Sequence, residues 1–197
     1  MCLVLTAWRA HPAYLLVVAA NRDEFYERRT APLDWWRDEP EVLAGRDLDD
    51  AGAGGTWMGV ARCGRFAVVT NVREPADIRA GAFSRGELPA RYLGGQQPPR
   101  EFLDELATRD GDYNGFNLLL SDRRQASDEL LPDTGIPLEW ERLLSSAFIA
   151  SPGYGTRSST VLRVRHDGSF DIAERSFDPD GATGERYIHG MLNLQDG

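Results

Sequence analysis

The sequence has 197 residues, of which 42% are hydrophobic, and it carries 31 acidic against 22 basic side chains, a formal net charge of −9. This length and apolar content suit one domain with a sizeable core. The negative charge argues against nucleic acid as a partner, because a phosphate-binding surface needs clustered positive charge.

Several other classes of protein are excluded by residue usage. All 22 basic residues are arginines, so lysine chemistry is impossible and only an α-amino group can supply a catalytic amine. The longest apolar run, residues 15–20, is too short to span a membrane. Two cysteines, Cys2 and Cys63, and the lack of a signal-like start predict a cytoplasmic protein. Cysteine and histidine show no metal-binding spacing, so we expect no metal and no cofactor.

The first half of the chain is rich in strand patterns. Apolar residues 3–8 and 14–20 are separated by five residues and predict a β-hairpin. Residues 57–61 and 66–70 repeat the pattern and predict a second hairpin. The acidic, glycine-rich residues 47–55 predict a loop.

The second half mixes helix and strand patterns. Pro98-Pro99 precedes residues 100–107, whose apolar side chains share one face and predict an amphipathic helix, and residues 85–93 predict another. Strands are expected at 116–120, 159–164 and 170–174, the last two joined by an Asp167-Gly168 turn, whereas 138–144 fits either helix or strand. Hairpins at both ends with helices between them predict an α+β layered domain.

Cys2 is the first candidate for chemistry, because removal of Met1 would leave its thiol beside a free α-amino group. A thiol of pKa about 8.5 is mostly protonated at neutral pH, and an amine of pKa about 8 can accept its proton. Cys2 is therefore a candidate nucleophile that carries its own base. The alternative is a small residue that begins a buried strand.

A polar tetrad, Asn21-Arg22-Asp23-Glu24, directly follows the second apolar segment. Simple register in the first hairpin would bring Arg22 and Asp23 towards Cys2. Arg22 would then lower the thiol pKa and hold a carbonyl or carboxylate, and Asp23 would orient the amine. The alternative is an ordinary surface loop.

Two further polar residues lie at the ends of predicted strands. Asn71 closes the strand 66–70, and its side-chain amide could stabilise an oxyanion. Arg157 precedes the strand 159–164 and could clamp a substrate carboxylate or align other site residues. The alternatives are a strand-ending turn residue for Asn71 and a polar turn for Arg157.

The order of these motifs resembles the NRDE family, to which animal transport and Golgi organisation protein 2 belongs. The matching elements are Met1-Cys2, Asn21-Arg22-Asp23-Glu24, Ala44-Gly45-Arg46-Asp47, Gly54-Gly55-Thr56-Trp57-Met58-Gly59, Thr70-Asn71, Ser84-Arg85-Gly86, Tyr113-Asn114-Gly115-Phe116-Asn117-Leu118, Leu131-Pro132-Asp133-Thr134-Gly135 and Tyr154-Gly155-Thr156-Arg157.

The resemblance implies an N-terminal nucleophile hydrolase-like fold, a four-layer αββα sandwich of antiparallel sheets, in one domain over residues 1–197. It also implies removal of Met1, and a catalytic set of Cys2, Arg22, Asp23, Asn71 and Arg157. The interval 119–130 is shorter than in the family and lacks a Ser-Asn pair, whose Asn would be a further oxyanion donor.

Two functions follow from these residues and from the resemblance. The first is hydrolysis of a non-peptide C–N amide bond in an acylated small molecule. The second is non-catalytic binding or carriage of haem or a lipid-like ligand, with Trp35, Trp36 and Trp57 lining an apolar pocket. The sequence predicts neither the substrate nor the oligomeric state.

Overall fold

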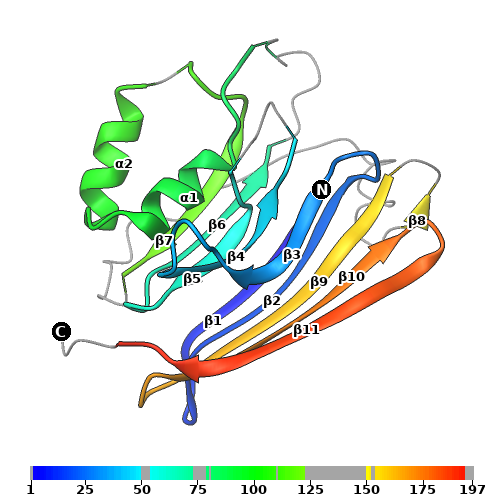
Figure 1. Ribbon diagram of the computed structural model, residues 1–197. Coiled ribbons are helices and arrows are strands. Elements are labelled where there is room, and N and C mark those ends of the chain that lie inside the picture. Colours follow the sequence, from blue (N-terminus) through cyan, green and yellow to red (C-terminus); the bar gives the residue numbers. More distant parts are fainter. Residues whose placement is uncertain are drawn as a thin grey trace.

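The computed structural model describes residues 2–49, 54–72, 79, 81–109, 111–122, 150–151 and 154–193. In this part of the chain two antiparallel β-sheets lie face to face, and two helices cover the outer face of one of them (Figure 1). The expected segment 138–144 and most of the short interval 119–130 lie outside the described residues.

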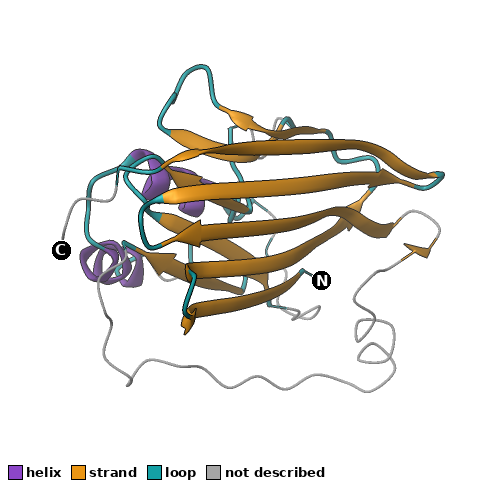
Figure 2. Cartoon of the chain, turned by 90° about the horizontal axis from the view of Figure 1, so that it is seen from below, coloured by secondary structure: helices purple, strands orange, loops and turns teal. Residues whose placement is uncertain are grey.

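The first sheet has the strand order β1-β2-β9-β10-β11, with the short β8 paired to β9. Viewed from below, its long strands lie side by side (Figure 2). Their bounds are β1 Leu3–His11, β2 Tyr14–Phe25, β8 Ala150–Ser151, β9 Tyr154–Arg165, β10 Ser169–Asp178 and β11 Gly181–Met191.

The second sheet contains five strands in sequence order, each antiparallel to the next. Their bounds are β3 Thr30–Trp35, β4 Val42–Asp47, β5 Met58–Ala61, β6 Phe66–Asn71 and β7 Phe116–Ser121. The β5–β6 pair confirms the second predicted hairpin.

The main core fills the space between the two sheets. Alternate residues of each strand point inward, as the two-residue period of a strand requires. Val18 from the first sheet and Leu43 and Val60 from the second are almost completely buried there. Burial of this apolar surface is the dominant force that holds the sheets together.

A second core joins the second sheet to helices α1 (Glu87–Gly94) and α2 (Pro99–Ala107), both close to the predicted positions. Tyr92 and Phe102 meet edge-to-face with ring centroids 5.5 Å apart. Gly59 lets α1 approach β5 closely, since a Cβ there would lie 2.8 Å from Leu93 Cδ1. No helix among the described residues is long and apolar enough to cross a membrane.

The first hairpin differs from its prediction in length. The strands run to His11 and from Tyr14, so the connection is Pro12-Ala13 and not five residues. The tetrad lies inside β2 and not after it, because β9 pairs with β2 as far as Phe25. Gly168, with φ of +88°, makes the predicted tight turn between β9 and β10.

Candidate functional site

A cavity of about 600 Å³ opens at one end of the sheet sandwich. Because neighbouring strands are antiparallel, the beginnings of β1 and β9 and the ends of β2 and β10 meet at this end. The beginning of β3, the ends of β4 and β6, the segments before β5 and α1, and part of β11 also line it. All five residues singled out from the sequence line it, namely Cys2, Arg22, Asp23, Asn71 and Arg157.

Cys2 lies half-buried at the start of β1, next to the end of β2, because Leu3 pairs with Asn21. Burial raises the pKa of the Cys2 thiol, whereas a hydrogen bond from the Asp23 backbone N–H and the charge of Arg22 act in the opposite direction. The net rise means that this thiol stays protonated at neutral pH unless a nearby base removes its proton.

Arg22 is largely buried and lies beside Glu24, with Arg22 Nη2 3.8 Å from Glu24 Oε2. Burial lowers the pKa of Arg22, and the negative charge of Glu24 opposes the shift. A guanidinium nevertheless keeps its proton in proteins. Arg22 thus supplies a positive charge where a thiolate or oxyanion would form.

Asp23 is 6% exposed and accepts a hydrogen bond of 2.8 Å from the Thr156 hydroxyl. Burial raises the pKa of Asp23, and the Thr156 hydrogen bond partly offsets this. The pairing of β2 with β9 shifts register here, from Arg22 opposite Ser158 to Asp23 opposite Thr156. This irregularity places Arg22 and Asp23, though adjacent in sequence, on the wall of the same cavity.

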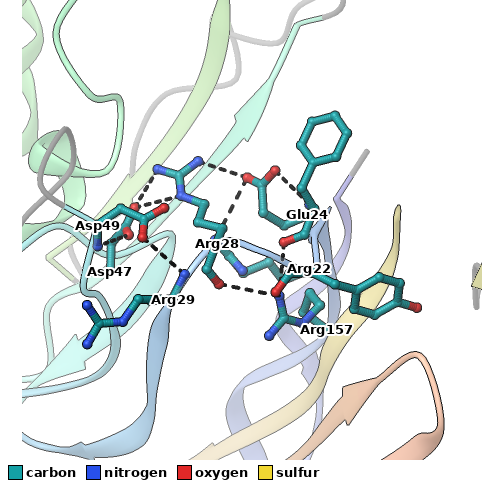
Figure 3. A network of polar contacts seen from close by, with 9 residues as sticks. Arg22, Glu24, Arg28, Arg29, Asp47, Asp49 and Arg157 are labelled. Atoms are coloured by element: carbon teal, nitrogen blue, oxygen red, sulfur yellow. Dashed lines mark hydrogen bonds and ion pairs between the residues drawn. The ribbon is translucent and has the colours of Figure 1, made fainter. Parts of the chain in front are cut away.

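Arg28 joins the two sheets through an ion-pair network (Figure 3). Its Nε lies 2.9 Å from Asp47 Oδ2 and its Nη1 lies 2.9 Å from Glu24 Oε2. Glu24 belongs to the first sheet and Asp47 ends β4 of the second, so Arg28 fixes the two walls of the cavity relative to each other. No local sequence pattern indicates this role for Arg28.

Arg157 acts on the backbone and not on another charged side chain in the described residues. Its guanidinium donates to the carbonyl oxygens of Phe25 at 2.9 Å, Tyr26 at 3.0 Å and Phe177 at 3.2 Å. These bonds hold the turn after β2, from which Arg28 extends. The geometry favours alignment of other site residues over a direct clamp on a substrate.

Asn71 ends β6 and exposes its side chain to the cavity. In the described part of the chain, its amide makes no hydrogen bond to another side chain or backbone group. An amide donor on the same cavity as a thiol is the arrangement that an oxyanion would need.

Glu174 is a second cavity residue that was not among the candidates predicted from the sequence. It is 7% exposed, accepts hydrogen bonds from the Leu33 N–H at 3.0 Å and the Thr160 hydroxyl at 3.0 Å, and lines the cavity. Burial raises the pKa of Glu174, opposed by these two bonds and by the charge of Arg22. Its side chain points inward because residues 170, 172 and 174 alternate along one strand, and Phe170 and Ile172 face the core. This two-residue alternation is the sequence pattern that could have indicated the position of Glu174.

The raised pKa of Glu174 predicts a pH-dependent stability. A carboxyl group whose folded pKa exceeds its ordinary value of 4.5 contributes stability below that pH, and the contribution is lost as the pH rises through the folded pKa. Glu174→Gln should therefore unfold with a flatter pH dependence from pH 4.5 to neutrality. Urea unfolding at a series of pH values measures this.

The exposed carboxylate of Glu101 provides the control for that measurement. Glu101→Gln should leave the wild-type pH dependence unchanged. Equal slopes for wild type and Glu174→Gln would show that burial of Glu174 has no energetic effect on folding.

The three tryptophans proposed to line an apolar pocket lie in different places in the structure. Trp57 lines the cavity. Trp36 is buried in the helix-side core and donates its indole N–H to the Ala44 carbonyl at 3.0 Å. Trp35 packs edge-to-face on Phe170 with centroids 6.3 Å apart. Trp35 and Trp36 therefore have packing roles.

Comparison with known proteins identifies the family. The family model described as Transport and Golgi organisation 2 matches residues 1–131 and 119–179. The chain belongs to this family. The Transport and Golgi organization protein 2 homolog of Bos taurus is 37% identical over 126 residues, 62% of this chain and 45% of the relative. The Homo sapiens homolog is 34% identical over 135 residues, 66% of this chain and 49% of the relative.

A relative from an insect is also similar to this chain. The Drosophila melanogaster protein named Transport and Golgi organization protein 2 is 29% identical over 131 residues, 60% of this chain and 45% of that relative. The chain spans about half the length of the curated relatives it matches.

Among the described residues, no group of His, Cys, Asp and Glu is placed to hold a metal ion.

Proposed function

We propose that this chain is a cysteine N-terminal nucleophile hydrolase that cleaves a non-peptide C–N amide bond of an acylated small molecule. The observation that carries the proposal is the position of Cys2 on a cavity of about 600 Å³ together with Arg22 and Asp23 of β2 and Asn71 of β6, which belong to different sheets. A cavity of this size accommodates a small organic molecule.

In the proposed reaction, removal of Met1 frees the α-amino group of Cys2, which takes the thiol proton. The thiolate attacks the amide carbon, and Asn71 donates to the oxyanion. The C–N bond then breaks, and the leaving amine takes the proton from the α-ammonium group. Water attacks the resulting thioester, which releases a carboxylic acid and restores the thiol.

Each polar residue has a part in this scheme that follows from its contacts. Asp23 donates its backbone N–H to Cys2 and directs its carboxylate to Thr156, so it fixes the position of the thiol. Arg22 stabilises negative charge beside it. Arg157 positions the turn that carries Arg28.

The proposal includes the four-layer αββα arrangement. The described residues contribute two sheets and one helical layer. The outer face of the first sheet exposes large apolar side chains, among them Leu5, Val161 and Tyr187. An apolar face of this kind is suited to a further covering layer.

A second candidate function is binding or carriage of haem or a lipid-like ligand without chemistry. The half-buried Trp57 and the exposed Phe83 on the cavity favour it, because aromatic surface in a cavity binds apolar ligands. Spectral titration with haem and with an acyl-CoA separates the two candidates. Absence of saturable binding at micromolar concentrations would contradict this second candidate.

Intact-protein mass spectrometry with iodoacetamide tests the first candidate. We expect loss of Met1 and one fast adduct on Cys2, because the free amine accepts the thiol proton. A form with an uncleaved N-terminal extension is the control. There the raised pKa of the Cys2 thiol should make alkylation slow at neutral pH and faster only as the pH rises. Retained Met1, or a Cys2 slower than the exposed Cys63, would overturn the proposal.

A further inference from the structure

Arg85 is the cavity residue that neither the proposed reaction nor the ion-pair network uses. It lies half-buried in the segment just before α1 and lines the cavity. One nitrogen, Nη1, donates to the Gly115 carbonyl at 2.9 Å. Within the described residues, its guanidinium makes no other hydrogen bond and no ion pair, so its remaining N–H groups are available to a ligand.

The other cavity arginines are in different situations. Arg28 is paired with Glu24 and Asp47, and Arg46 is paired with Asp38 at 2.5 Å. Arg157 is occupied by backbone carbonyls, and Arg22 lies beside Glu24. Arg186 is exposed to solvent on β11. In the described part of the chain, Arg85 alone among them combines partial burial, no carboxylate within ion-pair distance and only one hydrogen bond to the backbone.

A half-buried cation without a partner attracts an anion. Burial lowers the pKa of Arg85 by removing water from its charge, and the charge of Glu24, which lies beyond ion-pair distance, only partly opposes this. An anionic ligand in direct contact would offset the remaining cost. Two free donor positions on one guanidinium match the two oxygens of a carboxylate.

The walls of the cavity indicate what else the ligand carries. Trp57 and Phe83 present aromatic surface, and Val69 and Pro32 add aliphatic surface. Phe83 is 55% exposed although it is large and apolar. Such a surface next to a cation fits a molecule with an apolar body and one charged end.

The charge balance distinguishes a carboxylate from a phosphate. Six arginines and six acidic residues line the cavity, so its formal charge is balanced. A dianionic phosphate would meet repulsion from the acidic residues and would need more donors than one guanidinium offers. A monoanion needs only Arg85.

We propose that Arg85, with Trp57 and Phe83, forms a recognition site for the carboxylate of an apolar ligand. The site does not require Cys2 to be catalytic. One further step rests on the proposed hydrolase function: if that function holds, the carboxylate belongs to the amide substrate.

A pair of probes of equal shape tests the site in the full chain carrying Cys2→Ala, which removes turnover. Calorimetry should give phenylbutyrate at least about tenfold tighter binding than phenylbutyramide, because only the carboxylate forms a charge-assisted pair. Arg85→Gln should abolish this preference and leave the amide affinity unchanged. Arg85→Lys should retain part of the preference, since it keeps the charge without the planar fork.

Arg186→Gln is the matched control, because Arg186 lies on the same cavity but is exposed, and it should keep the full preference. Equal binding of both probes to the Cys2→Ala chain would overturn the proposal. A parallel loss of both probes in Arg85→Gln would also overturn it, by showing a structural role. Tighter binding of phenylbutyl phosphate than phenylbutyrate would overturn the choice of carboxylate. None of these outcomes depends on hydrolysis, so the proposed function is judged separately.

Discussion

Replacement of Cys2 by Ala should reduce amide hydrolysis by at least about a thousandfold, because removal of a covalent nucleophile leaves only binding and oxyanion stabilisation. Alanine is small and therefore compatible with removal of Met1. Turnover is measured on a panel of acylated amines and acylated amino acids, with intact mass recorded for each protein.

Cys63 supplies the control for this experiment. It is exposed in the turn between β5 and β6 and does not line the cavity. Cys63→Ala should retain full activity. If processed Cys2→Ala kept wild-type turnover, the nucleophile would lie elsewhere and the proposed reaction would be wrong.

Replacement of Asn71 by Ala should lower kcat by about 10² to 10³ and change KM little, because an oxyanion donor acts mainly in the transition state. Its side chain is exposed to the cavity at the end of β6. Asn71→Asp should lose at least as much activity, since a carboxylate would repel the oxyanion. Steady-state kinetics with the best amide of the panel measure both variants.

Asn117 is the matched control for Asn71. It lies on the neighbouring strand β7 opposite Thr70, to whose hydroxyl it donates at 3.3 Å, and it does not line the cavity. Asn117→Ala should keep kcat near that of the wild type. A rise in KM without a fall in kcat for Asn71→Ala would assign Asn71 to substrate binding.

Much of the secondary structure was predictable because local patterns agreed with the final packing. The pair β5–β6 and the helices α1 and α2 lie within a few residues of their predicted positions. Strands β3, β4, β8 and β11 were not predicted. β11 is exposed along nearly its whole length, so it carries no alternating pattern to detect.

The candidate site was predictable in its residue types and only partly in its contacts. The register of the first hairpin does bring Arg22 and Asp23 to Cys2. For Arg157, local sequence left a substrate clamp and an aligning role open. Two of the backbone carbonyls that it binds, those of Phe25 and Tyr26, lie more than a hundred residues earlier in the chain, so only the folded structure favours the second role.

The sequence by itself determined the strand and helix periods, the cysteine at position 2, the absence of lysine and the family, because these depend on residues or on motif order. The tertiary structure decided which ends of strands meet at one cavity, and that pairing with β9 keeps the tetrad inside β2. It also decided that Glu174 is buried beside Leu33, and that Arg85 has no carboxylate partner within ion-pair distance among the described residues. These features depend on long-range pairing and on removal of water from charged groups, which no local pattern records.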